Sequence, residues 1–272
     1  MIDIGSRLEL LLDDYLIDRT AGVSQQLHRP TPREIVFEHQ EPWEGNASVY
    51  DTVFQDDGLY RLYYAGNQVD EETGEEPHPE FACYAESQDG IHWTKPRLEL
   101  VAFNGSRDNN IIIEGIGTHC FTPFKDTNPD CEPDARYKGL GRGVGEQRLT
   151  LFAFKSPDAI HWSLMSDAPV ITDGYFDSQN LAFWDNLRGE YRAYFRDLKD
   201  GIRDIKTSTS KDFLDWTKGA WLEYPWAPIE HLYTNQVIPY YRAPHIFLGF
   251  PSRYVHDRGV RTDFNRMLAE KQ

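Results

Sequence analysis

Basic residues are scarce in this chain relative to acidic ones. Its 272 residues include 28 Lys and Arg against 44 Asp and Glu, a formal net charge of −16 at pH 7. A surface of this sign repels phosphates and anionic lipids, so neither a nucleic acid nor a membrane is expected as a partner. The acidic excess suits a neutral ligand or one that needs carboxylates, and a solvated acidic surface explains it equally well.

Cysteine and long apolar runs are also scarce. The three cysteines, Cys83, Cys120 and Cys131, are an odd number without metal-type spacing, so we expect no disulfide framework, no metal and no cofactor. No stretch approaches the roughly 18 apolar residues of a membrane span. The first residues lack the basic and apolar regions of a secretory signal, so a cytoplasmic location is expected.

What the sequence does contain is an internal repeat, Ser-x-Asp-x-x-x-Trp. The copies are Ser87/Asp89/Trp93, Ser156/Asp158/Trp162 and Ser210/Asp212/Trp216, with Trp-to-Trp separations of 69 and 54 residues. These separations are within or a little above the length of one four-stranded propeller blade. Each copy follows a strand-like stretch and supplies turn residues, which predicts a hairpin. We interpret the Asp as a turn residue and the Trp as packing between blades.

The repeat predicts a single all-β domain, a propeller of four-stranded antiparallel blades. Residues 1–44 lead into the domain, 45–100 form blade one, 101–168 blade two, 169–225 blade three, and 226–272 an incomplete fourth blade. Short extended pieces are expected within residues 8–17. No fourth Ser-x-Asp-x-x-x-Trp copy follows, so about three and a half blades are present. Their open edges favour self-association.

Three Phe-x-Asp pairs, at 54–56, 124–126 and 183–185, align the blades and indicate which residues face the propeller axis. Polar side chains gather around the starts of the inner strands, where they interrupt otherwise apolar segments. The candidates for substrate binding are Tyr50, His119, Gln179, Asn180, Arg196, His231 and Asn235. His119 is as compatible with a hydrogen-bonded core histidine as with an orienting or sugar-binding group.

Three carboxylates, Asp51, Asp177 and Glu230, are the catalytic candidates. Asp51 and Asp177 break strand propensity at matched places in the repeat, and an unpaired buried carboxylate is costly. Glycoside cleavage needs two carboxyl groups, one as acid and one as nucleophile or base. Asp51 and Asp177 can instead cap backbone N–H groups at strand entrances.

Several segments resemble the five-bladed β-propeller superfamily of invertase-like, levansucrase-like and arabinanase-like glycosidases, the family 32- and 43-like fold. They are DDYLID (13–18), SQDGIHW (87–93), DARYKGL (134–140), FDSQN (176–180) and YTNQVIPYY (233–241). The resemblance implies a five-bladed architecture, with a catalytic Asp beginning the first inner strand. By position, Asp51 has that role, Asp177 is a second carboxylate, and Glu230 is the candidate acid.

These observations favour a glycoside hydrolase-like protein that cleaves or binds a neutral oligosaccharide. The invertase-type Asn-Asp-Pro-Asn, Arg-Asp-Pro and Glu-Cys signatures are absent from the sequence. A non-catalytic carbohydrate-binding or protein-interaction propeller, including a truncated inactive relative, is therefore the alternative, because fold does not fix function.

Overall fold

The computed structural model describes residues 2–70, 72–225 and 227–255, and nearly all of its regular structure is β. The first sheet contains β1 (Thr52–Asp56), β2 (Leu59–Gly66), β3 (Phe81–Ser87), β4 (Trp93–Thr94) and β5 (Ile111–Glu114). The second contains β6 (Thr122–Lys125), β7 (Tyr137–Arg142), β8 (Leu151–Ser156) and β9 (Ser163–Leu164), and the third β10 (Leu181–Asp185), β11 (Glu190–Lys199), β12 (Ile202–Ser210) and β13 (Ala220–Trp221). Then follow β14 (His231–Leu232), β15 (Ile238–Tyr240), β16 (Ala243–Leu248) and β17 (Arg253–Tyr254), and the 3-10 helices are η1 (Pro133–Ala135) and η2 (Gly145–Leu149).

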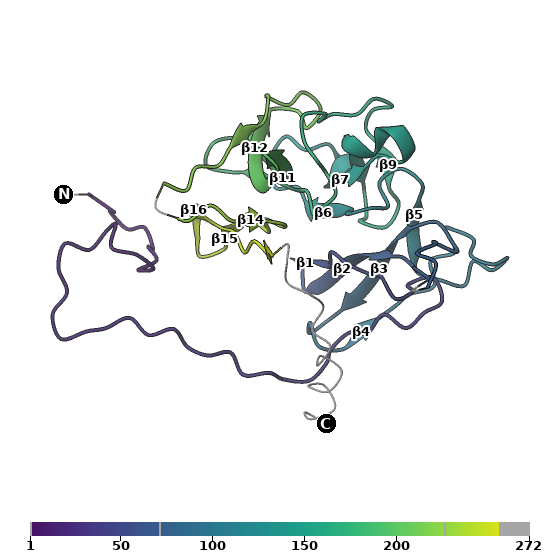
Figure 1. Ribbon diagram of the computed structural model, residues 1–272, viewed down its shortest axis with the longest axis horizontal. Helices are drawn as coiled ribbons and strands as arrows, with labels where there is room; N and C mark the ends of the chain where they lie inside the picture. The colour runs from purple at the N-terminus through teal and green to yellow at the C-terminus, as the bar shows by residue number, and fades with distance from the viewer. Residues whose placement is uncertain (1, 71, 226, 256–272) are drawn as a thin grey trace.

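Three sheets repeat one antiparallel order, in which each strand pairs with the next along the chain. The orders are β1-β2-β3-β4, β6-β7-β8-β9 and β10-β11-β12-β13, and Figure 1 shows these sheets arranged around a common centre. Two small sheets follow, β14 with β17 and β15 with β16. The predicted all-β propeller with four-stranded blades is confirmed.

Two details concern the limits of the blades. β5 falls within the range expected for blade two, yet it pairs with β3 of the first sheet. Of the range expected for the fourth blade, residues 226 and 256–272 lie outside the described residues.

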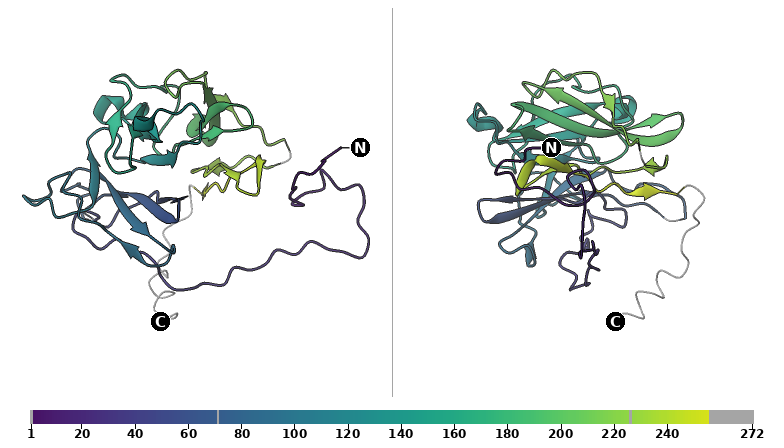
Figure 2. Two further views of the ribbon diagram at one scale, coloured as in Figure 1. Left: turned by 180° about the vertical axis from the view of Figure 1, so that it is seen from behind. Right: turned by 90° about the vertical axis from the view of Figure 1, so that its left-hand side faces the viewer.

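The N-terminal arm, residues 2–40, contains no strand. Figures 1 and 2 show it running outside the sheets, from the side of β16 round to the first sheet. Near its start, Glu9 Oε1 lies 3.1 Å from His245 Nε2 of β16. The extended pieces expected within residues 8–17 are wrong, because Asp13 and Asp14 accept local N–H bonds there and fold the segment into turns.

The repeated Ser-x-Asp-x-x-x-Trp pattern folds into the same turn in all three blades. In the first copy, Asp89 Oδ1 accepts hydrogen bonds from the backbone N–H groups of Ile91 and His92, both at 2.8 Å. Asp158 and Asp212 accept the equivalent pair of bonds at 2.8–3.0 Å. The predicted turn role of these Asp residues is confirmed.

One residue of each turn adopts the left-handed backbone region. It is Gly90 in the first copy, with φ of 75°, and Ala159 and Phe213 in the other two, both with φ of 71°. The Trp three residues later donates its indole N–H to the carbonyl of this residue at 3.1–3.2 Å. Backbone and indole therefore fix each other, which places the Trp ring against the apolar layer.

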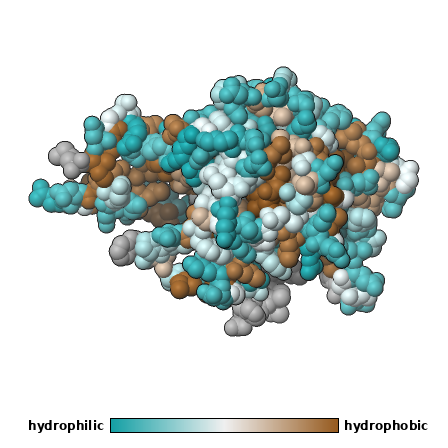
Figure 3. Space-filling model, turned by 90° about the horizontal axis from the view of Figure 1, so that it is seen from above, coloured by the Kyte–Doolittle hydropathy of each residue, from teal (hydrophilic) through white to brown (hydrophobic). Residues whose placement is uncertain are grey.

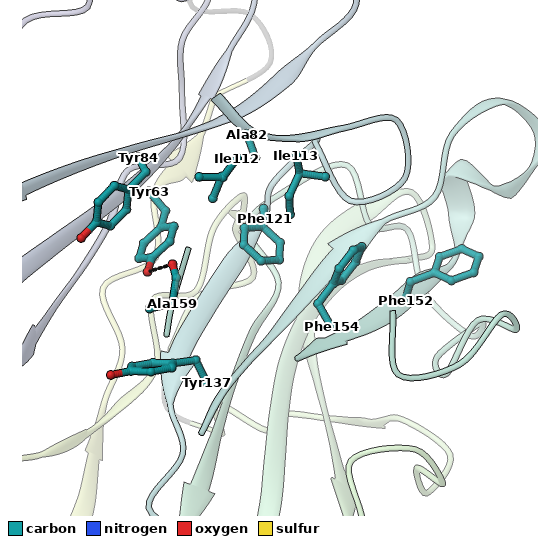
Figure 4. Packing of buried hydrophobic residues seen from close by; sticks show 10 residues of the cluster. All are labelled: Tyr63, Ala82, Tyr84, Ile112, Ile113, Phe121, Tyr137, Phe152, Phe154 and Ala159. Atoms are coloured by element: carbon teal, nitrogen blue, oxygen red, sulfur yellow. Dashed lines mark hydrogen bonds between the residues drawn. The ribbon is translucent and has the colours of Figure 1, made fainter. Parts of the chain in front are cut away.

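The core consists of apolar layers between neighbouring sheets. In the layer between the first two sheets, Tyr63 packs edge-to-face against Phe121, and Trp162 packs against both. Figure 4 shows this layer, in which the Tyr63 hydroxyl donates to the carbonyl of Ala159 at 2.8 Å. Burial of aromatic side chains of this size stabilises by about 1.5–3 kcal/mol each.

Later layers repeat this arrangement. Leu140 and Leu151 of the second sheet meet Ala193 and Phe195 of the third, with Trp216 at the margin. A further layer packs Phe183, Tyr194 and Ile205 of the third sheet against Val237 and Phe247. The fourth unit is thus attached by side-chain packing as well as by chain connection.

Other apolar residues are exposed, and Figure 3 shows them on one face as separate patches among hydrophilic side chains.

A buried carboxylate ties each of the first two sheets to the next. Asp56, at the end of β1, binds Arg61 Nε of its own sheet at 2.7 Å. It also binds Lys125 Nζ at 2.7 Å and the Tyr137 hydroxyl at 2.6 Å, both from the second sheet. Asp56, the Asp of the first Phe-x-Asp pair, is therefore an inter-blade clamp.

The second clamp has the same design. Asp126 Oδ2 accepts from Lys138 Nζ of its own sheet at 2.5 Å and from the Tyr191 hydroxyl of the third sheet at 2.7 Å. In the third sheet, Asp185 binds Arg188 and Arg192.

Candidate functional site

Charged side chains cluster around Asp177, which precedes β10. Its Oδ1 lies 3.1 Å from Arg142 Nη1 and 3.2 Å from His119 Nε2, and its Oδ2 lies 3.6 Å from Arg196 Nη2. The Asp177 side chain is 46% exposed. This carboxylate is thus both firmly paired and accessible to a ligand from solvent.

Successive sheets supply the cluster. Arg142 ends β7 and Arg196 lies on β11, while His119 stands shortly before β6. The first sheet adds Glu80, immediately before β3, whose carboxylate lies 3.0 Å from His119 Nδ1. His119 therefore bridges Glu80 on one ring nitrogen and Asp177 on the other.

Aromatic rings complete the cluster from the first and fourth units. The Tyr50 hydroxyl lies 3.0 Å from that of Tyr233, and the Tyr50 ring meets the His119 ring edge-on at 5.9 Å. The Arg196 guanidinium lies 4.9 Å from the centre of the Tyr233 ring and 5.2 Å from that of Tyr175. Tyr50 has a φ of 62°, a left-handed conformation that is uncommon for a bulky residue.

Electrostatics fix the protonation states of the central pair. The ion pair with His119, together with the nearby arginines, holds the pKa of Asp177 well below its usual range despite partial burial. Burial disfavours charged His119, but its interactions with acidic neighbours, led by that with Asp177, outweigh burial and raise its pKa to about 11. Burial also raises the pKa of Tyr50. At neutral pH the centre is therefore carboxylate, imidazolium and neutral phenol.

Two buried guanidinium donors in this cluster have no hydrogen-bond partner among the described residues. They are Nη1 of Arg196 and Nε of Arg142. The Arg196 side chain is only 1% exposed. Buried donors are nearly always paired, so two buried N–H groups without a partner are unusual.

Of the residues singled out in the sequence, Tyr50, His119, Asp177 and Arg196 come together here. Asp51 stands next to Tyr50, but its half-exposed side chain lies 3.5 Å from His39 Nε2. The segments on either side of it are joined to the Asp177 region, because Gln179 Nε2 donates to Thr52 Oγ1 at 3.0 Å. Asp51 and Asp177 therefore flank one region without touching each other.

Three other candidates bind backbone groups. Asn235 Nδ2 donates to the carbonyls of Gln179 and Tyr194 at 3.1 and 3.2 Å. Asn180 Nδ2 donates to the carbonyls of Phe176 and Ser178 at 3.2 and 2.7 Å. His231 Nδ1 accepts from the backbone N–H of Arg203 at 3.2 Å. These bonds hold strands and loops in place, and substrate binding by these side chains stays a prediction.

Glu230 lies elsewhere. Its Oε1 is 2.9 Å from Arg253 Nη1. It lines a cavity of about 490 Å³ with Leu222 and Tyr224, and neither Asp51 nor Asp177 is among the lining residues. The structure thus groups Asp177 with arginines and His119, and Glu230 with an apolar cavity.

Sequence reasoning missed Glu80, Arg142 and Tyr233 as members of the cluster. Glu80 ends an acidic loop, and Arg142 ends β7 without belonging to any motif. A usable signal for Glu80 was its position directly before the strand β3, because His119 and Asp177 lie in the segments before β6 and β10.

Within the described ranges, no three His, Cys, Asp or Glu side chains are placed to hold a metal ion. In the same ranges, no helix is long and apolar enough to cross a membrane.

Comparison with known proteins identifies the class of the fold. Neither a protein-family model nor a curated protein matches the sequence. Zg3597, a family 117 glycoside hydrolase from the marine bacterium Zobellia galactanivorans, is similar to this chain with a TM-score of 0.50 and 14% identity, over 74% of this chain and 54% of that one. The fold is similar to that of this glycoside hydrolase, and the resemblance stated from sequence motifs is confirmed at the level of the fold.

Two further solved structures are similar at lower scores. One, from the GH130 family of mannoside phosphorylases and described as containing glycoside hydrolases that target β-1,2 mannosidic linkages in Candida mannan, has a TM-score of 0.49 and 16% identity, over 80% of this chain and 63% of that chain. The other, a glycosyl hydrolase from Bacteroides ovatus, has a TM-score of 0.48 and 15% identity, over 79% and 63%. This chain spans between about half and two thirds of the length of these proteins.

Proposed function

We propose that this chain is a glycoside hydrolase-like protein that binds an oligosaccharide at the Asp177 cluster. The observation that carries the proposal is the convergence of Tyr50, His119, Asp177, Arg196 and Tyr233 from four successive units of the propeller. Tyrosine rings offer faces for sugar stacking, and charged donors and acceptors read hydroxyl groups. Similarity to Zg3597 supports the fold on which such sites occur.

Asp177 is the member of this cluster that can stabilise positive charge. Because Asp177 stays ionised at neutral pH, its carboxylate can stabilise an oxocarbenium-like transition state or act as a base, but it cannot donate a proton. Asp51, half-exposed beside Tyr50, is the second carboxylate of the proposal, as nucleophile or as the base that activates water. Glu230, which lines the other cavity, has no part in it.

The test is a panel of glycosides and oligosaccharides assayed with the wild type, Asp51→Asn and Asp177→Asn. We expect either substitution to lower turnover by about 10²–10³-fold, because each removes a charge that matters most in the transition state. Asp130→Asn, an exposed carboxylate outside the cluster, is the matched control and should leave turnover unchanged. An Asp51→Asn variant with full activity would remove Asp51 from the proposal.

A non-catalytic carbohydrate-binding protein is the second candidate. It is favoured by the pairing of both carboxylates that contact His119, Asp177 and Glu80, since neither is a free acid. Binding of a glycan without turnover, lost in Asp177→Asn, would select this alternative.

A further inference from the structure

The charge of the Asp177 cluster is opposite to that of the molecule. His119, Arg142 and Arg196 are cationic, while Asp177 and Glu80 are the carboxylates that pair with them. These five groups carry an excess of one positive charge, with Asp51 outside their contacts and beside His39, on a chain whose formal net charge is −16. A local field of this sign favours one negative charge on whatever binds there.

The unpaired donors indicate where that charge would sit. Arg196 is almost wholly buried, and its Nη1 has no partner among the described residues, nor has Nε of Arg142. A planar guanidinium offers N–H groups in a fork that matches the oxygens of an acidic group. Burial of such a donor without an acceptor is unfavourable, so an acceptor supplied by a ligand that reaches it would be stabilising.

Access and sugar contact are available at the same place. Asp177 is 46% exposed, so the cluster is open to solvent on that side. Tyr175, whose ring lies 5.2 Å from the Arg196 guanidinium, is also partly exposed and offers an aromatic face. A sugar ring can therefore approach with its acidic substituent directed to the arginines.

We propose that the glycan bound at this site carries a singly charged acidic group, recognised by Arg196 and Arg142. The group is a carboxylate, as in a uronic acid, or a sulfate ester. This inference rests on the proposed carbohydrate function and deepens it. The expectation of a neutral oligosaccharide came from the charge of the whole chain, whereas recognition depends on the charge of the cluster.

The test measures binding by isothermal titration calorimetry, without turnover. The probes are galacturonic and glucuronic acid, galactose and glucose as their neutral counterparts, glucose 6-sulfate, and inorganic phosphate. We expect an acidic sugar to bind at least about tenfold more tightly than its neutral counterpart. The uronic acids and the sulfated sugar distinguish the two sources of charge, and a preference for either supports the proposal.

Variants link the preference to the arginines. Arg142→Gln and Arg196→Gln should abolish the preference for the acidic sugar, and Arg196→Lys should retain part of it. Arg97→Gln, at an exposed arginine paired with Asp108, is the control and should change nothing. Because Arg196 is buried, its substitution can impair folding, and the more exposed Arg142 then carries the test.

Three outcomes would overturn the proposal. They are equal or tighter binding of the neutral sugars, a preference that survives Arg142→Gln in folded protein, and phosphate binding as tight as that of the acidic sugars. The proposed function fails separately, by absence of both turnover and glycan binding across the panel. Hydrolysis of neutral glycans without any acidic preference would uphold that function and reject this inference.

Discussion

Asp158 shows how much one side chain contributes to the local structure. Its Oδ1 accepts two backbone N–H bonds, its Oδ2 lies 2.7 Å from His161 Nδ1, and the turn places Trp162 in the inter-blade layer. We predict that Asp158→Ala lowers the free energy of unfolding by about 1–2 kcal/mol, because the turn loses acceptors. Urea denaturation measures this loss. Asp167→Ala, at an exposed carboxylate of the following loop, is the control, and equal stability of the two variants would contradict a turn role.

Asp56 gives the fold a dependence on acid. Burial opposes its ionisation, but hydrogen bonds from Lys125, Tyr137 and Arg61 prevail and lower its pKa to about 2. A carboxyl group with a lowered folded-state pKa stabilises fully above its unfolded pKa near 4, and this stabilisation is lost as pH falls toward 2.

We therefore predict that the urea midpoint of the wild type falls between pH 4 and pH 2 more steeply than that of Asp56→Asn. At neutral pH the variant should be less stable, because Arg61 and Lys125 lose their shared anion. Parallel pH profiles would show that Asp56 is not the group responsible.

At the residue scale, the role of a side chain could be predicted from the sequence where its hydrogen bonds are made within a few residues. Turn Asp residues and their Trp partners could be assigned because all their bonds are made within a few residues. Arg142 could not, because its role depends on the approach of Asp177 from the next sheet. Glu230 directly precedes β14, but its place in the sequence does not reveal that its carboxylate pairs with Arg253 and lines another cavity.

At the scale of elements, strands were predicted within a few residues wherever an apolar strand met a repeat turn. The strands β3, Phe81–Ser87, β8, Leu151–Ser156, and β12, Ile202–Ser210, each end at the Ser that begins a copy of the repeat. The pairing of β5 with β3 was not foreseen, since antiparallel pairing across an intervening strand leaves no local signal. The N-terminal arm failed as a strand prediction because none of the described strands pairs with it.

The clamps between sheets make a prediction about elements. Tyr191 of the third sheet donates its hydroxyl to Asp126 of the second at 2.7 Å. We predict that Tyr191→Phe destabilises the protein by about 1–2 kcal/mol, because a hydrogen bond to a charged acceptor is lost while the ring remains. Thermal or urea unfolding measures this effect.

Tyr60→Phe is the control for that experiment, because Tyr60 lies on β2 outside the clamps. Unchanged stability of Tyr191→Phe would mean that the clamp geometry adds nothing beyond the packing of the ring.

At the scale of the whole molecule, the fourth unit leaves apolar side chains uncovered. Ile229, 84% exposed, lines the cavity of about 490 Å³, and Ile238 of β15 is 55% exposed. We expect the fourth unit to mediate self-association, since exposed apolar side chains and open strand edges favour it. The net charge opposes association, so added salt should promote it.

Light scattering at rising protein concentration tests this expectation. Ile229→Lys should reduce the associated fraction, whereas Leu187→Lys, at an exposed apolar residue on the turn between β10 and β11, should not. A strictly monomeric wild type at high concentration and high salt would contradict it.

The contrast between a cationic cluster and an acidic exterior has a kinetic consequence. An acidic glycan approaching from a distance meets repulsion from a chain of net charge −16, which slows the encounter, and salt screens that repulsion. Contact with buried Arg196 is made at short range, where screening is weak. Raising the ionic strength would therefore increase the association rate constant and leave the dissociation rate constant largely unaltered. The protein would bind its acidic ligand faster at high salt than in dilute buffer.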